Sequence, residues 1–141
     1  MAATTENLYV GDGSTVLYSF TFPYIETTDV QVSLDKVPTT DWSLANPTTV
    51  EFVTAPADGV AIRIHRITDS TAVTATFFPG SAIRAQDLNA DFEQTLFVVQ
   101  EATVDAVVAR DDAAEAIIRA EQARDEAQLA KEEAEDAKEA A

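Results

Sequence analysis

The residues that could carry chemistry are few in this chain of 141 residues, and their spacing matches no catalytic motif. The one histidine, His65, lies between Arg63 and Arg66 in a predicted strand, and the chain has no cysteine. A nucleophilic triad needs a base that a carboxylate orients, and zinc sites need Cys and His at short spacing. His65 is therefore expected at the surface or on an edge strand. These residues predict a protein that is not an enzyme and that needs no cofactor or metal.

Glycines and paired acids are the remaining candidates for a binding site. Gly11, Asp12 and Gly13 lack the spacing of a phosphate-binding loop and are typical of a hairpin turn. A calcium site that uses Asp12 is the less favoured alternative. The adjacent acids at 111–112 and 132–133 lie where a helix is predicted, so we expect solvated charge there.

Net charge and hydropathy exclude several classes of protein. The chain has 25 acidic and 9 basic side chains, a formal net charge of −16, which argues against nucleic-acid binding because phosphate contacts need clustered Lys and Arg. Its apolar runs are too short to span a bilayer, so no membrane insertion is expected. The first basic residue is Lys36, so a secretory signal is not predicted.

Composition changes sharply near residue 81. All four glycines and all five prolines lie before it, and the remaining positions have neither residue. Because Gly and Pro interrupt helices, their absence permits one long helix. We predict a β-rich head over 1–80, a strand-to-helix junction that begins the helix over 81–103, and an Ala-rich acidic stalk over 104–141.

The head is predicted to contain short antiparallel strands. In 16–22, positions 16, 18, 20 and 22 are large and apolar and positions 19 and 21 are small hydroxyl residues, which places the aromatics on one buried face. Further strands are expected over 29–34, 49–53 and 60–67, and a last one over 73–78. The fold class is therefore α+β: a small antiparallel β-sandwich or open barrel, followed by one long helix.

The helical region carries an unbroken pattern of steps of four and three residues. This spacing is the repeat of a left-handed coiled coil, with Val99 at position a and Ala102 at position d. Position 141 continues the pattern. The residues predicted to form the interface between chains are Leu88, Phe92, Thr95, Val99, Ala102, Ala106, Ala109, Ala113, Ala116, Ala120, Ala123, Ala127, Ala130, Ala134 and Ala137.

We call these interface residues the seam. The charged residues beside the seam indicate whether neighbouring chains run in the same direction. In a parallel coiled coil, a residue at position g faces the residue five places later, at position e, on its neighbour. This rule pairs Asp105 with Arg110, Glu126 with Lys131 and Glu133 with Lys138. Arg119 and Arg124 are a like-charged exception. The pattern favours parallel chains and leaves dimer and trimer both open.

A second interpretation of the helical region stays open. A solitary Ala-rich helix would also explain the composition, since alanine has the highest helix propensity. Buried methyls contribute about 0.8 kcal/mol each, so twelve alanines supply at most about 10 kcal/mol per chain, and the stalk is expected to be marginal.

Large aliphatic residues also lie off the seam, at 104, 107, 108, 117 and 118. They indicate packing on the head or a partner, the interpretation that we favour. The alternative is a helix break at Asp112, where the spacing to Glu115 resembles a capping box.

The ordered motifs of the chain resemble a known family. Several of them are similar to the N-terminal, tail-anchoring domain of podovirus tail fibres of the autographivirus (teseptimavirus-like) type. The matching segments are Gly11 to Thr15, Tyr18 to Tyr24, Thr54 to Gly59, Ile62 to Thr68, and above all Phe78 to Asn89 with Gln94-Thr95 and Gln100 to Ala102. The resemblance covers residues 6 to about 103. The expected head-to-helix junction consists of Gly80, Ser81, Ile83, Arg84, Asp87, Leu88 and Asn89.

The resemblance implies a structural virion protein. Such fibres are parallel homotrimers that attach to the short phage tail near its adaptor and nozzle proteins, and a shaft or a separate receptor-binding protein follows the anchor. The implied location is the fibre base on the virion tail, after synthesis in the host cytoplasm. The alternatives are the anchor domain of a depolymerising tailspike and a non-phage oligomerising adhesin stalk.

Overall fold

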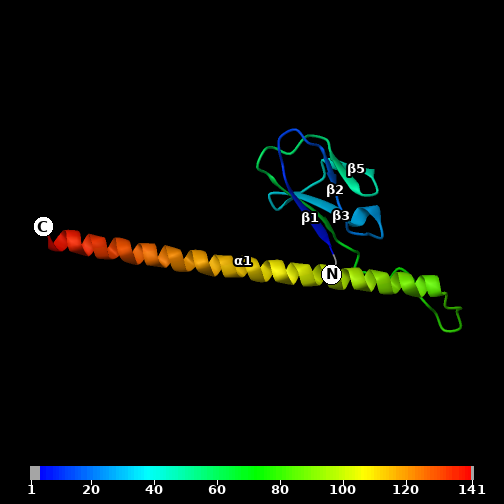
Figure 1. The fold of residues 1–141 in the computed structure, drawn as a ribbon. Coiled ribbons are helices and arrows are strands. Elements are labelled where there is room, and N and C mark those ends of the chain that lie inside the picture. The colour runs from blue at the N-terminus through cyan, green and yellow to red at the C-terminus, as the bar shows by residue number, and fades with distance from the viewer. Residues whose placement is uncertain (1–3, 141) are drawn as a thin grey trace. The chain divides into compact units, whose positions relative to one another are not determined.

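The computed structural model describes residues 4–140 of the chain. Two compact units make up the chain, residues 1–102 and residues 103–141, and each is described by itself. The described elements are β1 (Glu6–Val10), β2 (Leu17–Ser19), the short 3-10 helix η1 (Thr27–Asp29), β3 (Val30–Leu34), β4 (Val37–Thr39), β5 (Trp42–Asn46), β6 (Thr49–Phe52), β7 (Ala61–Arg66) and α1 (Ala85–Glu139) (Figure 1).

The strands form two antiparallel sheets. One sheet has the order β1-β7-β3-β4 and the other the order β2-β6-β5. Ile62 and Ile64 of β7 lie opposite Leu34 and Val32 of β3. Ile62, Ile64 and Val32 are buried, and Leu34 is partly buried. Residues of both sheets, including Val50 and Ile64, belong to a single apolar core. Antiparallel sheets followed by one long helix confirm the predicted α+β class, and the shared core gives the head two layers.

The alternating segment 16–22 turns its aromatics inward, as predicted, but only part of it is a strand. Tyr18, Phe20 and Phe22 are at most 7% exposed, and the Phe20 and Phe22 rings stack with centroids 4.7 Å apart. The ladder with β6 ends at Ser19, which lies opposite Thr49. Beyond it the Phe20 N–H donates to the Thr48 carbonyl at 2.8 Å and the Thr21 N–H donates to Asn7 Oδ1 at 3.0 Å, so hydrogen bonds as well as packing hold the last two aromatics.

The connection at residues 11–13 is not the predicted hairpin turn. β1 pairs with β7 and β2 pairs with β6, so this segment carries the chain from one sheet to the other. Gly11 leaves no room for a side chain, since a Cβ there would lie 2.4 Å from the Ala57 carbonyl oxygen. Asp12 holds the loop by accepting hydrogen bonds from the backbone N–H groups of Ser14 and Thr15.

Residues 73–78 do not form the predicted strand. Their backbone groups have partners on the helix instead: the Thr74 N–H donates to Gln94 Oε1 and the Ala75 N–H donates to Asp91 Oδ1, at 2.9 and 2.8 Å. Three strands that the sequence pattern did not predict, β1, β4 and β5, complete the two sheets.

His65 does not lie on an edge strand. β7 is paired on both sides, and His65 lies opposite Glu6 of β1 and Gln31 of β3. Its side chain is partly buried there.

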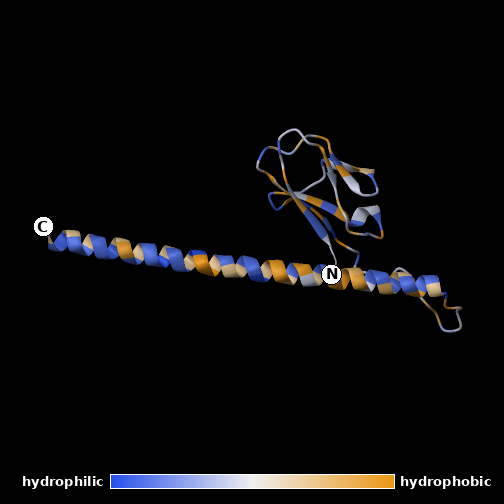
Figure 2. Ribbon diagram, in the orientation of Figure 1, coloured by the Kyte–Doolittle hydropathy of each residue, from blue (hydrophilic) through white to orange (hydrophobic). Residues whose placement is uncertain are grey.

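The helix α1 is continuous through the region where a break was an alternative. It runs from Ala85 to Glu139, four residues later in its start than the composition boundary at 81. The alternative of a break at Asp112 is therefore wrong. Val107, Val108, Ile117 and Ile118 are between 42% and 60% exposed on the single chain. Figure 2 shows hydrophobic and hydrophilic residues interleaved along α1.

Asp12 provides a test of the inter-sheet connection. The Thr15 hydroxyl, together with the N–H groups of Thr15 and Ser14, holds the pKa of Asp12 well below its ordinary value of 3.8. A depressed pKa means that the carboxylate stabilises the folded state above pH 3.8, and that this contribution is lost as the pH falls through the folded-state pKa. We expect Thr15→Val to raise the pKa of Asp12 and Thr15→Ser to preserve it, as measured by NMR titration. An equal pKa in both variants would contradict the role of the hydroxyl.

Candidate functional site

Two opposite faces of α1 define the candidate site within the first unit. The docked face, which packs on the head, consists of Asp91, Gln94, Phe97 and Glu101. The apolar face consists of Leu88, Phe92, Leu96 and Val99, all at least 38% exposed. Residues three and four positions apart share one side of a helix, so each set forms a continuous stripe.

A buried arginine joins the docked face to the head. The Arg66 side chain has no exposed surface, and its Nε donates to Glu101 Oε1 at 2.5 Å. Its other nitrogens donate to the Pro23 carbonyl at 2.6 Å and to Gln100 Oε1 at 3.1 Å. The guanidinium carbon lies 3.8 Å from the centre of the Phe97 ring. Because a buried charge needs both a counter-charge and hydrogen bonds, these contacts hold the helix at one position on β7.

Glu101 also fixes the chain where it leaves β7. Its carboxylate accepts hydrogen bonds from the Thr68 N–H at 2.9 Å and from the Thr68 hydroxyl at 2.7 Å. One carboxylate therefore neutralises Arg66 and ends the sheet at the same point.

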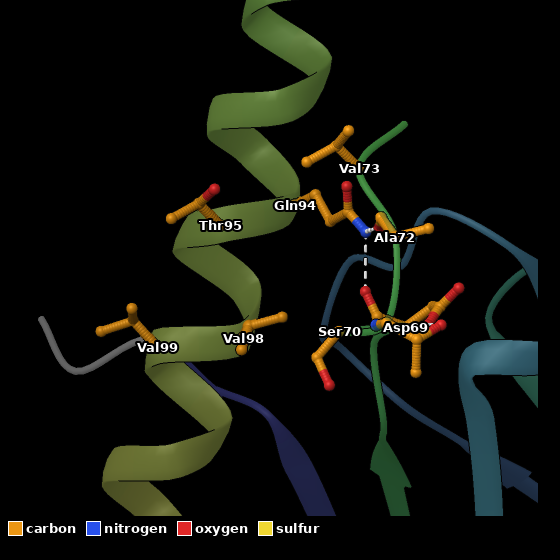
Figure 3. Close-up of a pocket in the computed structure, with 9 residues that line it drawn as sticks. Asp69, Ser70, Ala72, Val73, Gln94, Thr95, Val98 and Val99 are labelled. Carbon is orange, nitrogen blue, oxygen red and sulfur yellow. Dashed lines mark hydrogen bonds between the residues drawn. The ribbon is translucent and has the colours of Figure 1, made fainter. Parts of the chain in front are cut away.

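Gln94 holds the loop that follows. Its side-chain nitrogen donates to the Asp69 and Ala72 carbonyls, each at 2.7 Å (Figure 3). Its side-chain oxygen accepts from the Thr74 N–H and hydroxyl. All the hydrogen-bonding groups of this amide face the loop, which explains why Gln94 is buried.

The predicted junction is a loop-to-helix junction, because β7 ends at Arg66 and no strand follows it in the described chain before α1. The Ser81 N–H donates to the Phe78 carbonyl at 2.9 Å, and Gly80 has φ +85°. Pro79 and Gly80 occupy the second and third positions of this turn, as in a type II turn.

The helix begins at Ala85, and three residues separate it from the turn that ends at Ser81. The Leu88 N–H donates to the Arg84 carbonyl at 3.1 Å, and Asp87 lies in the first turn, where the helix dipole favours an acid. Ile83 and Asn89 are exposed.

The predicted interface residues lie on the exposed side of α1 in the single chain. Leu88, Phe92 and Val99 are 38%, 63% and 56% exposed, and Thr95 and Ala102 are also exposed. Residues 105–140, which include the remaining predicted alanines and the charged g and e residues, are exposed as well.

Within the second unit, two ion pairs lie along one chain. Arg119 contacts Glu115 at 2.8 Å and Arg110 contacts Asp111 at 3.5 Å. All four side chains are at least 64% exposed, so each pair contributes about 1 kcal/mol or less to stability.

Sequence patterns did not assign roles to Arg66, Gln94, Leu96 and Glu101. Three of these, Arg66, Gln94 and Glu101, stood in the motifs that carry the family resemblance, which was the available signal. Leu96 had a different signal, an apolar side chain at position e, where Arg and Lys prevail further along the helix.

Within residues 4–140, no group of three or more His, Asp or Glu side chains is placed to hold a metal ion. No helix in this range has both the length and the apolar character that a bilayer span requires.

Comparison with known proteins assigns the family. Residues 1–122 match the family described as "Phage T7 tail fibre protein, N-terminal domain". The chain belongs to this family. The match includes the whole first unit, with the docked and apolar faces of this tail fibre domain, and extends into the second unit.

Two curated relatives carry the name "Tail fiber protein". The protein of Escherichia phage T7 is 36% identical over 116 residues, and that of Enterobacteria phage T3 is 34% identical over the same length. Each alignment covers 74% of this chain and 21% of the relative. The tail fibre domain thus spans about a fifth of the length of these relatives. The resemblance drawn from the sequence motifs is confirmed.

The buried ion pair of the tail fibre domain can be tested against an exposed one. Arg66→Met leaves Glu101 without its counter-charge, and we expect a loss of about 3–5 kcal/mol in the free energy of unfolding. Arg63→Met is the matched control. Arg63 lies on β7, as Arg66 does, and pairs with Glu6 of β1 at 2.5 Å, but its side chain is 36% exposed. Its substitution should therefore lower the free energy of unfolding by about 1 kcal/mol or less. Urea denaturation at fixed protein concentration measures both, and equal losses would contradict the role of Arg66.

Proposed function

We propose that this domain is the tail-anchoring end of a phage tail fibre and that three copies assemble in parallel through α1. The observation that carries the proposal is the apolar face of α1. Leu88, Phe92 and Val99 are exposed there although the opposite face of the same helix is docked on the head. The spacing of these residues continues into the alanine seam without interruption.

Burial energy supports assembly through this face. Burying a Leu, Phe or Val side chain contributes about 1.5–3 kcal/mol, and burying an alanine methyl about 0.8 kcal/mol. The layers at Leu88, Phe92 and Val99 therefore stabilise the trimer most strongly per residue. The alanines extend the same seam through the stalk and let the helices approach closely.

Charge beside the seam supports parallel chains. The pairs Asp105 with Arg110, Glu126 with Lys131, and Glu133 with Lys138 form between neighbours only when all chains run in the same direction. Three chains rather than two follow from the family resemblance, since alanine alone does not select the number of strands.

Each of the three segments distinguished by composition has its own role. The head, 1–80, is the part that docks on the tail, with the adaptor and nozzle proteins as its partners. The junction, 81–103, starts the trimer helix, and the stalk, 104–141, leads toward the rest of the fibre or a separate receptor-binding protein. Attachment through three copies gains avidity, and the role is structural rather than catalytic.

The location that accords with this role is the fibre base on the virion tail. The protein is made in the host cytoplasm before the particle assembles. Its strongly acidic stalk favours solubility and would be repelled by a negatively charged cell envelope until the distal end of the fibre binds.

A charge in the seam tests the assembly. Ala120→Asp places one carboxylate per chain at the trimer axis, where desolvation costs several kcal/mol per ion against alanine layers that supply at most about 10 kcal/mol per chain. We expect light scattering at micromolar concentration to show a fall from the mass of three chains.

Ala114→Asp is the matched control, because Ala114 lies at position b and should leave the mass unchanged. If Ala114→Asp, or the exposed-face change Glu115→Lys, disrupts assembly and Ala120→Asp does not, the register is wrong. A single-chain mass for the unaltered protein would overturn the proposal.

A further inference from the structure

The strand β1 lies at one end of its sheet, and its outer edge is paired with no other strand within residues 4–140 (Figure 1). The Arg66 N–H donates to the Thr5 carbonyl at 3.0 Å. Because backbone groups alternate in direction along an antiparallel pair, positions 7 and 9 also bond to β7. The N–H and C=O groups that point away from the sheet therefore belong to Glu6, Leu8 and Val10.

The other edge strands of the described sheets carry features that hinder pairing with a further strand. β4 contains Pro38, which has no N–H, β5 has an irregular register between Leu44 and Asn46, and β2 has only three residues. Prolines, bulges and short strands are common means by which proteins block a sheet edge. β1 has five residues and none of these features. Among the described strands, β1 is thus the edge best suited to accept an added strand.

Apolar side chains flank this open edge. Leu8 and Val10 are 67% and 68% exposed, and Ala61, which lies opposite Val10, is exposed as well. Glu6 is the one acid of the strand and is paired with Arg63. Strand addition takes its affinity from main-chain hydrogen bonds and its specificity from alternate side chains. The edge therefore fits an extended segment with apolar side chains at alternate positions.

Charge near the end of β1 narrows the choice of occupant. Residues 1–80 carry nine acidic and three basic side chains. Asp12 follows the strand by two residues, and Asp58 is close to the same end, because the Gly59 N–H donates to the Gly11 carbonyl at 3.0 Å. Both acids are exposed. Complementary charge favours a segment with a Lys or Arg at this end and disfavours a second copy of the acidic head.

Symmetry also argues against a second copy as the occupant. Two β1 strands would pair about a two-fold axis, whereas a closed trimer of parallel chains has a three-fold axis. The other described edges of a second copy carry the hindering features. A strand from a different protein is the better match.

We propose that β1 accepts an extended segment of a phage tail protein as an added strand. Apolar side chains of that segment lie against Leu8 and Val10, and a basic side chain lies beside Asp12 and Asp58. The inference rests on the proposed function, in which the head docks on the tail, and it names the surface and the kind of partner. Each head of the trimer offers the same edge, so attachment at more than one edge gains avidity.

Leu8→Lys tests the edge, because a lysine on an edge strand hinders strand addition. Binding of the full chain is measured to purified tail complex that contains the adaptor and nozzle proteins and lacks fibres. We expect the dissociation constant to rise about tenfold or more. Val37→Lys is the matched control, since Val37 is 65% exposed on the hindered edge strand β4, and it should change the constant by about twofold or less.

Residue-resolved hydrogen exchange, read by mass spectrometry, provides the second measurement. The amide protons of Leu8 and Val10 should exchange rapidly in the fibre protein alone and slowly in the tail complex. The amide proton of Tyr9 bonds to β7, so it should exchange slowly in both samples.

The outcomes separate this inference from the proposed function. If the unaltered chain binds and Leu8→Lys binds equally well, or if the Leu8 and Val10 amides stay unprotected in the complex, strand addition is wrong and tail anchoring stands. If the unaltered chain does not bind the tail complex, both are overturned. Protection of these amides in the fibre protein alone, with a mass above three chains by light scattering, would make a second copy the occupant and overturn the inference.

Discussion

Arg66 carries a full positive charge on a side chain with no exposed surface, and this requirement organises the first unit. A buried guanidinium must be neutralised and its donors must be satisfied, and here Glu101, Gln100 and the Pro23 carbonyl supply the partners. Two of these partners lie on α1 and one on the loop after the β2 segment. The charge can therefore be buried only when strand, loop and helix meet. A stripe of purely apolar contacts would not specify the rotation of the helix so sharply.

The orientation of α1 decides which residues are left for assembly. Because Gln94, Phe97 and Glu101 face the head, the residues on the opposite side of the same turns are exposed. Leu88 and Phe92 are apolar, so this exposure is unfavourable for a single chain in water. In the proposed trimer, which rests on family membership and the repeat of the seam, the exposed face contacts the helices of the neighbouring chains. In that proposal, the head positions the part of the seam that would bury the largest side chains, and the alanine stalk follows it.

Local patterns predicted much of the fold because they depend on near neighbours in the chain. Alternation identified the inward aromatics of 16–22, and the absence of Gly and Pro identified the long helix. Segment 73–78 shows where such reasoning ends. Its composition suits a strand, but the N–H groups of Thr74 and Ala75 are satisfied by Gln94 and Asp91, which lie 20 and 16 residues further on. A pattern within the segment contains no information about those partners.

The sequence by itself determined the α+β class, the change of composition near residue 81, the acidic surface and the four-and-three spacing of the seam. These properties follow from backbone preferences, charge and periodicity, each of which is local. Only the tertiary structure decided that Arg66 is buried, that residues 11–13 cross between sheets, and which face of α1 docks on the head. Those outcomes depend on contacts between residues far apart in the chain, such as Arg66 with Glu101. The energy of such a contact exists only once the surrounding fold has excluded water from it.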